Sequence, residues 1–193
     1  MNNKIIVVTG YPASGKSTFA QKLSKSLNIP CLIKDTFKIA ICTKISVTTV
    51  EESRLYSSVT FDAMMYVVER IMETNSPIII EGNFVPAGIK DTDESYVIRT
   101  LIDKYNYHSL TFKFFGDTKI LHNRYIERDN LPERGGVNAF YKGVPHTDFD
   151  MICRSLDSFY ISDNVISIDT TDFDLINFDG HIETAHSFLF DVT

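Results

Sequence analysis

The sequence predicts an α/β protein with a doubly wound, largely parallel sheet of five strands. Short apolar segments alternate along the 193 residues with longer amphipathic ones, which is the pattern of strands connected by helices. A turn framed by two glycines follows the first apolar segment directly, and no repeat, linker or low-complexity tract interrupts the alternation. We therefore expect one three-layer domain over residues 1–193, with helices on both faces of the sheet.

Five segments have the short apolar character of buried parallel strands, and the first of them is built from β-branched residues. The third is the most apolar. The fourth carries three phenylalanines that we expect in the core, Phe112, Phe114 and Phe115. The expected strands cover residues 5–8, 30–35, 77–84, 109–115 and 165–168.

The segments between the strands show helical spacing or helix-start residues. The first has apolar residues at Phe19, Leu23 and Leu27, and Asp117 with Thr118 suits the N-cap of the helix that begins there. The longest helix is expected to bury an apolar side made of Leu55, Val59, Val67, Val68 and Ile71. The expected helices cover residues 16–27, 51–74, 89–105, 118–128, 147–160 and 175–190.

Composition and charge exclude some classes of protein. The net charge of −6 argues against broad electrostatic binding to nucleic acid or anionic membranes, although a local basic groove stays open. The three cysteines have no metal-ligand spacing, so we expect free buried thiols. No segment resembles a signal peptide or reaches membrane-spanning length. We expect a cytoplasmic protein, with a monomer as the default.

Residues 10–18 read Gly-Tyr-Pro-Ala-Ser-Gly-Lys-Ser-Thr, the Walker A pattern of a P-loop between a strand and a helix. Its glycines allow the backbone N–H groups to converge on phosphate oxygens. Lys16 is expected to reach the β- and γ-phosphates, and the Ser17 hydroxyl to coordinate Mg²⁺. The residues expected to bind ATP here are Gly10, Pro12, Ala13, Ser14, Gly15, Lys16, Ser17 and Thr18.

Other features of the sequence favour a kinase among the P-loop proteins. The guanine-reading pattern Asn-Lys-x-Asp of GTPases is missing from the sequence. Motor ATPases usually end the Walker B strand with Asp or Asp-Glu, whereas the candidate strand here ends in Glu81. A phosphoryl-transfer kinase is the class that remains.

Asp35 ends the second expected strand and is the candidate catalytic carboxylate. A kinase that acts on an alcohol needs such a group to orient the acceptor hydroxyl and take its proton. Lys38 lies one helical turn further on, where it is a candidate to hold an anionic acceptor or the migrating phosphoryl group. The alternative is that Asp35 only caps a helix that begins at Thr36.

Glu81 ends the strand expected beside the P-loop strand. It is a candidate to hold a Mg²⁺-bound water or to contact the acceptor hydroxyl. Alternatively, a carboxylate at the end of a strand bonds only nearby backbone N–H groups.

A lid is expected over about residues 118–146. Arg124 and Arg128 lie four residues apart on one helix face, and the glycines after Arg134 allow the segment to swing. Such a lid excludes water and aims guanidinium groups at the developing charge, and Arg134 is a weaker candidate for the same role. The alternative is a solvated helix whose arginines pair with Glu127 at the surface.

The loop after the last strand is a candidate to contact the nucleotide base, with Thr170 as its expected contact residue. An Asp/Thr turn is also an ordinary end of a strand, so both interpretations stay open.

Taken together, five segments resemble the polynucleotide-kinase-like, zeta-toxin-like P-loop kinases. They are residues 10–18, Asp35 with a basic residue three positions on, residues 81–84 (Glu-Gly-Asn-Phe), the Arg-x-x-x-Arg pattern at 124–128 and residues 169–173 (Asp-Thr-Thr-Asp-Phe). The resemblance spans most of the chain. One departure is the lid segment at residues 132–136, which is poorer in arginine and histidine than related lids.

The resemblance implies a fold of the nucleoside-monophosphate-kinase type with strand order 2-3-1-4-5. It also implies ATP·Mg²⁺ as the donor, Asp35 as the base for the acceptor hydroxyl and Arg128 at the phosphates. Members of this group phosphorylate very different alcohols, including polynucleotide 5′-hydroxyls, nucleotide sugars and antibiotics.

The leading hypothesis is an ATP-dependent kinase whose acceptor is a hydroxyl of a small molecule, bound mainly by residues 36–60 and 84–95. A polynucleotide 5′-hydroxyl kinase is the second, disfavoured by the acidic composition and the lack of a basic-aromatic stripe. The third is a nucleotide-binding regulator, or the toxin of a toxin–antitoxin pair, that acts through a protein partner.

Overall fold

The computed structural model describes residues 3–45, 47–86, 93–129 and 143–191. Five parallel strands form one sheet in the order β2-β3-β1-β4-β5. The strands are β1 (Lys4–Gly10), β2 (Cys31–Ile33), β3 (Ile78–Glu81), β4 (His108–Phe115) and β5 (Val165–Asp169). The predicted three-layer α/β fold and strand order are therefore confirmed.

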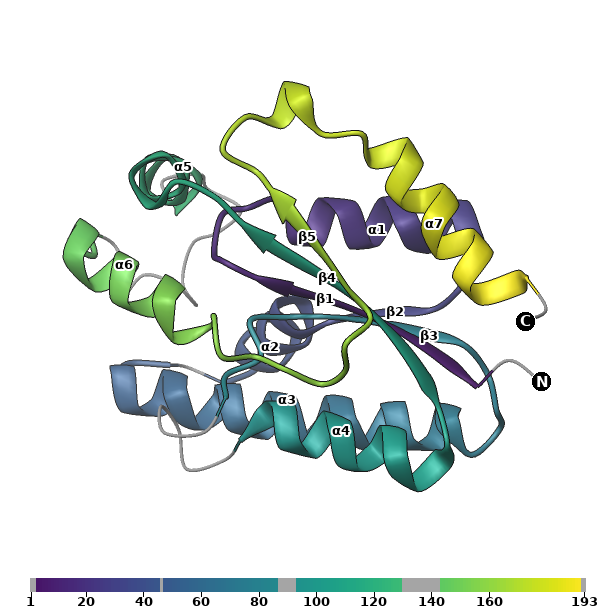
Figure 1. Ribbon diagram of the computed structural model, residues 1–193. Coiled ribbons are helices and arrows are strands. Elements are labelled where there is room, and N and C mark those ends of the chain that lie inside the picture. The colour runs from purple at the N-terminus through teal and green to yellow at the C-terminus, as the bar shows by residue number, and fades with distance from the viewer. Residues whose placement is uncertain (1–2, 46, 87–92, 130–142, 192–193) are drawn as a thin grey trace.

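Helices lie on both faces of the sheet (Figure 1). They are α1 (Lys16–Leu27), α2 (Lys34–Cys42), α3 (Val50–Met72), α4 (Glu94–Tyr105), α5 (Thr118–Asp129), α6 (His146–Ser155) and α7 (Phe178–Phe190), with a short 3₁₀ helix, η3 (Phe173–Leu175). In this described part of the chain, no helix is both long enough and apolar enough to cross a membrane.

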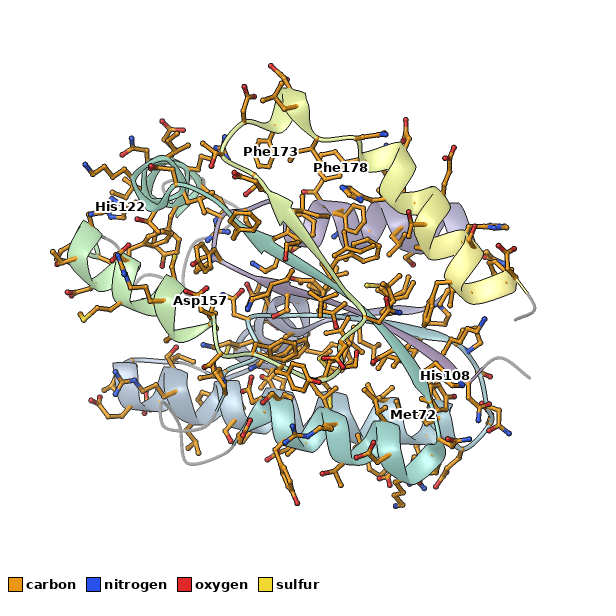
Figure 2. The ribbon with its side chains drawn as sticks, in the orientation of Figure 1. Met72, His108, His122, Asp157, Phe173 and Phe178 are labelled. Carbon is orange, nitrogen blue, oxygen red and sulfur yellow. The ribbon has the colours of Figure 1, made fainter. Side chains whose placement is uncertain are left out.

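Two hydrophobic cores form because successive side chains of a strand point to opposite faces of the sheet. Ile5 and Val7 of β1 face α3 and α4, whereas Ile6 and Val8 face α1 and α7. Figure 2 shows side chains filling both spaces, with Met72 in the first and Phe178 in the second. The middle of β1, from Ile5 to Val8, is thus covered on both faces, which is why these four residues are all apolar.

Several expected boundaries are wrong by a few residues. β2 ends at Ile33, so Asp35 belongs to the first turn of α2 rather than to the end of a strand. Phe115 is partly exposed because it follows the last fully covered position of β4. Of the region expected as a helix over 89–105, the described part forms α4 from Glu94 onward.

The buried side of α3 also differs from the expected one. Leu55 is 60% exposed and Val59 is exposed as well, whereas Val68 is buried. The N-terminal half of α3 packs against α2, where Lys38 donates to Ser53, and neither Leu55 nor Val59 belongs to a hydrophobic core. The residues of α3 that do enter the core are Phe61, Met64, Met65, Val68 and Met72.

The chain turns into the P-loop at a point where β1 and β4 approach closely. Gly10 has φ +121°, and an added Cβ would lie 1.9 Å from the carbonyl oxygen of Phe114. The next residue, Tyr11, donates its N–H to that same oxygen at 2.9 Å. Only glycine satisfies both the conformation and the space.

We expect Gly10→Ala to lower the free energy of unfolding strongly. Backbone strain alone costs about 1–3 kcal/mol, and the overlap with Phe114 adds to it. Gly143→Ala is the matched control, because Gly143 also has a positive φ but open space around its Cα. Chemical denaturation should show the larger loss at Gly10, and equal losses would contradict the role of the close approach.

Candidate active site

The P-loop joins β1 to α1 and ends in the N-cap of that helix. Gly15 is the N-cap and has φ +84°, and Ala13 also has a left-handed backbone. The Ser14 hydroxyl donates to the carbonyl of Tyr11 at 2.7 Å, which closes the loop on itself. The positive end of α1 and its free N–H groups therefore face the space above the loop, as anion binding requires.

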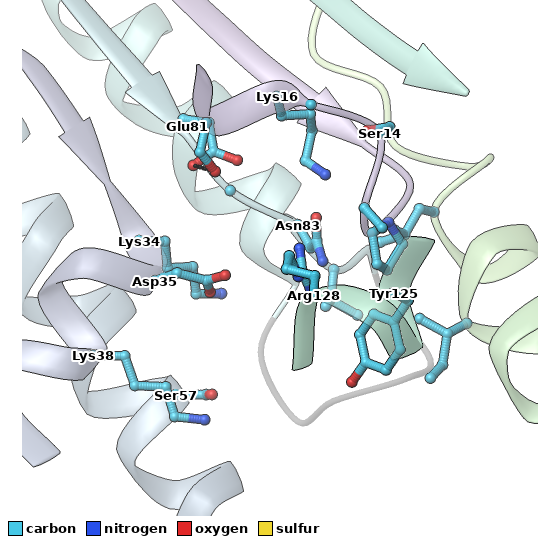
Figure 3. A pocket seen from close by; sticks show the side chains of 18 of the residues that line it. Ser14, Lys16, Lys34, Asp35, Lys38, Ser57, Glu81, Asn83, Tyr125 and Arg128 are labelled. Carbon is cyan, nitrogen blue, oxygen red and sulfur yellow. Dashed lines mark hydrogen bonds between the residues drawn. The ribbon is translucent and has the colours of Figure 1, made fainter. Parts of the chain in front are cut away.

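A cleft of about 1200 Å³ opens above the P-loop at the carboxyl ends of the strands. Figure 3 shows Lys16 and Glu81 on one side of it, Asp35 and Lys38 on another, and Arg128 and Tyr125 from α5 on a third. Twelve of the predicted site residues line it: Pro12, Ala13, Ser14, Gly15, Lys16, Ser17, Thr18, Asp35, Lys38, Glu81, Arg124 and Arg128.

Lys16 is buried beside the carboxyl end of β3. Its Nζ donates to the carbonyl of Tyr11. Burial lowers the pKa of Lys16 to about 8; the carboxylates of Glu81 and Asp35 oppose this shift, and the nearby charge of Arg128 adds to it. The charges of Glu81, Asp35 and Arg128 therefore all influence Lys16. β3, α2 and α5 thus bring charged groups close to the P-loop lysine.

Ser17 and Glu81 supply oxygen atoms suited to a magnesium ion. The Ser17 hydroxyl donates to Glu81 Oε2 at 3.2 Å, and both side chains line the cleft next to Lys16. Mg²⁺ prefers oxygen ligands and usually takes only one or two from the protein, keeping waters and phosphate oxygens for the rest. This donor pair therefore fits the ion that the sequence predicted.

Asp35 and Lys38 lie across the cleft from the P-loop. The N-cap of α2 is Ile33, so the alternative that Asp35 caps the helix is wrong. Lys38 is on the same helix one turn later and donates to the Ser53 hydroxyl of α3 at 2.8 Å. The contact ties α2 to α3 at the wall of the cleft.

The two arginines of α5 line the cleft at different places. Arg124 donates to the carbonyls of Thr170 and Thr171, the latter at 2.9 Å, and its guanidinium lies 4.1 Å from the ring centroid of Phe173. Arg128 lies near Lys16 and packs against the ring of Tyr125. α5 is therefore more than a solvated helix. The expected lid residues Pro132 and Arg134 lie outside the described part of the chain, together with the glycines that follow them.

Two predicted residues contribute indirectly. Gly10 shapes the entry into the P-loop, as described above. Thr170 is buried and donates its hydroxyl to the carbonyl of Phe115 at 2.8 Å, so its side chain is turned away from the cleft. Phe173 takes the exposed position instead, and an added Cβ at Gly15 would lie 3.1 Å from its ring.

Sequence reasoning missed two features of the cleft. Phe173 belongs to the segment 169–173, which was already a candidate for the site. The signal that could have identified it is an aromatic residue in a polar loop. Lys34 and Glu94 form an ion pair in the wall of the cleft, but they are 60 residues apart and no local pattern links them. Arg54 belongs to the segment 36–60 that the sequence predicted to bind the acceptor, and it lines the cleft from the N-terminal half of α3.

Comparisons with known proteins agree with this architecture. A family described as chromatin associated protein KTI12 matches residues 4–83, the part that carries the P-loop, Asp35 and Glu81. Among curated proteins, no sequence matches the chain.

Solved structures of kinases are similar over nearly the whole chain. A proposed kinase from Chloroflexus aurantiacus j-10-fl has a TM-score of 0.86 at 20% identity, with 98% of this chain and 100% of that chain covered. A gluconokinase from Sinorhizobium meliloti 1021 has a TM-score of 0.56 at 12% identity, covering 97% and 92%. Shikimate kinase from Bacteroides thetaiotaomicron has 0.57 at 16%, covering 96% and 97%. At these identities, the comparisons show that the fold is that of P-loop kinases.

We expect the affinity for ATP to fall as the pH rises above about 8. Below that pH the ammonium of Lys16 is charged before ATP binds; above it, binding must include proton uptake, which weakens affinity by at most about tenfold per pH unit. Calorimetric titration with ATP·Mg²⁺ from neutral to alkaline pH measures the effect. Lys16→Met should bind weakly with no such dependence, and a flat profile in the wild type would contradict the assignment.

Proposed function

We propose that the protein is an ATP-dependent kinase that transfers the γ-phosphoryl group to a hydroxyl of a small molecule. One observation carries the proposal: the phosphate-binding Lys16 and the carboxylate of Asp35 face the same cleft from opposite walls. Pockets for one small ligand usually measure about 300–1000 Å³. The cleft of about 1200 Å³ favours two ligands side by side.

On the phosphate side, the P-loop N–H groups and Lys16 hold the β- and γ-phosphates of ATP. Ser17 and Glu81 would hold Mg²⁺, Glu81 through a bound water, and the ion would supply positive charge beside the phosphate oxygens. Arg128 contacts the equatorial oxygens of the group in transfer. Burial of Lys16 keeps water from weakening these contacts.

On the acceptor side, Asp35 accepts the proton of the hydroxyl that attacks. The acceptor oxygen forms a bond to the γ-phosphorus as the bond to the β,γ-bridging oxygen breaks, so ADP leaves with the electron pair. The proton that the acceptor loses goes to the Asp35 carboxylate. A position in the first turn of α2, directly after β2, holds that carboxylate on a rigid element.

The acceptor wall carries positive charge and hydroxyl groups. Lys38 of α2 and Arg54 of α3 line it, together with Ser57 and Ser58. This chemistry suits an alcohol that also bears a carboxylate or phosphate group, since both cations then bind the anion while Asp35 binds the hydroxyl.

The opposite end of the cleft suits the nucleoside. Arg124 is held by two backbone carbonyls and stacks on Phe173, which leaves a planar, cationic surface beside Lys22 and Phe178. Guanidinium planes and aromatic rings stack on nucleobases. In this proposal residues 1–193 act as one monomeric cytoplasmic domain.

A regulatory role is the second candidate, and the match of residues 4–83 to the KTI12 family favours it. It requires ATP binding at the same P-loop, with a protein partner in place of an acceptor. A polynucleotide acceptor stays a prediction of the resemblance, and strong salt dependence of turnover would favour it. ATP binding without any phosphorylated acceptor would favour the regulator.

The test is transfer of labelled γ-phosphate to nucleosides, sugars, nucleotide sugars, hydroxy acids, aminoglycosides and 5′-hydroxyl oligonucleotides, with Lys16→Ala as the blank. We expect Asp35→Asn to lower kcat by about 10²–10⁴-fold, the usual contribution of a general base, while ATP binding is retained. Asp103→Asn, on the exposed surface of α4, should have full activity. Wild-type turnover by Asp35→Asn would disprove the assigned base.

For an acceptor that bears a carboxylate or phosphate, we expect Lys38→Met to raise the KM by about tenfold or more, because a charge-assisted contact is lost. The neutral analogue of the same alcohol should show little change. Lys44→Met is the matched control, since Lys44 is exposed and is not among the described residues that line the cleft. Equal effects on charged and neutral acceptors would show that Lys38 does not bind the anionic group of the acceptor.

A further inference from the structure

A buried ion pair lies in the wall of the cleft, next to the candidate base. Lys34 is the first residue of α2 and Glu94 is the first of α4. The Nζ of Lys34 lies 2.5 and 2.6 Å from the two carboxylate oxygens of Glu94. The side chains are only 8% and 2% exposed, yet both line the cleft. The pair joins two elements that are distant in sequence.

The surroundings of the pair are shaped to hold it. The Nζ of Lys34 lies 5.2 Å from the ring centroid of Phe61 and 5.9 Å from that of Phe84, both within reach of a cation–π contact. Glu94 Oε2 also accepts the backbone N–H of Val85 at 3.0 Å. At Gly82 an added Cβ would lie 3.0 Å from the Cβ of Lys34, so a side chain there would crowd the lysine.

Stability does not explain such a pair. Taking two charges out of water costs about as much as their attraction returns, and apolar residues of similar volume are often at least as stabilising. The pair instead connects two parts of the candidate site. Lys34 immediately precedes Asp35, and Glu94 holds Val85, which follows β3 and Glu81 by four residues.

We propose that the Lys34–Glu94 ion pair is a positioning element, which sets the first turn of α2 so that the Asp35 carboxylate faces the acceptor. Lys34 and Glu94 act through Asp35. The inference rests on the proposed function for its catalytic part. Its structural part, the placement of α2 by the pair, stands apart from activity.

The experiment replaces the pair by apolar residues in the double variant Lys34→Met/Glu94→Leu. We expect thermal stability close to the wild type and an ATP affinity within about twofold, but a kcat for transfer lower by about tenfold or more, with the KM for ATP unchanged. A loss in kcat alone is the pattern of a misplaced base, which a merely structural pair would not produce. Transfer within about twofold of the wild type would overturn the proposal.

The matched control is Glu69→Leu/Lys104→Met. This pair joins α3 to α4, with 2.7 Å between Lys104 Nζ and Glu69 Oε1, but it is not among the described residues that line the cleft. It should leave transfer unchanged. If the apolar double variant of the buried pair does not fold, Glu94→Asp replaces it. This variant keeps both charges and shortens the acidic side chain by one methylene group. We again expect a lower kcat with ATP affinity retained. An unchanged kcat would overturn the proposal.

Hydrogen exchange separates this inference from the proposed function. If the wild type phosphorylates nothing, the proposed function fails and the exchange result alone decides the structural part. We expect the amides of residues 38–42 in α2 to exchange about tenfold faster in the variant of the buried pair, and at the wild-type rate in the control. Unchanged exchange in both variants would overturn the placement of α2 by the pair.

Discussion

The candidate site depends on the pairing of β1 with β3 on one side and β4 on the other. Parallel strands end at the same edge of a sheet, and the register places Val8, Glu81 and Ile33 side by side across three strands. The P-loop and α2 therefore both begin at the same edge of the sheet, with Glu81 between them. This register brings Lys16 and Asp35 to opposite walls of a single cleft, although they are distant in sequence.

The charge in the cleft runs opposite to the charge of the whole chain. The chain has a net charge of −6, yet cations from the P-loop, α2, α3 and α5 line the cleft. Net charge governs solubility and long-range association, whereas a ligand in a cleft responds to the groups that face it. The local basic groove that the composition left open is therefore present at the cleft above the P-loop.

Much of the fold was predictable because periodicity and glycine placement are local properties of a sequence. The five strands, the P-loop between β1 and α1, and the helix start at Asp117 are all confirmed, the last by bonds from Asp117 Oδ1 to the N–H groups of Lys119 and Ile120. The apolar side of α3 was wrong at Leu55 and Val59. A helix spacing shows which residues share a face but not how far the sheet beneath extends.

The sequence by itself determined the conformation of the P-loop turn, because Gly10 and Gly15 confer backbone freedom that acts within a single turn. It also placed the acidic candidate Glu81 at the end of a strand, where the structure has it. Only the tertiary structure decided which residues contact one another. Thr170 turns inward while Phe173 lines the cleft beside Arg124, and Lys34 forms an ion pair with Glu94. Those contacts depend on how separate elements pack against one sheet, and packing between distant segments leaves no trace in local sequence spacing.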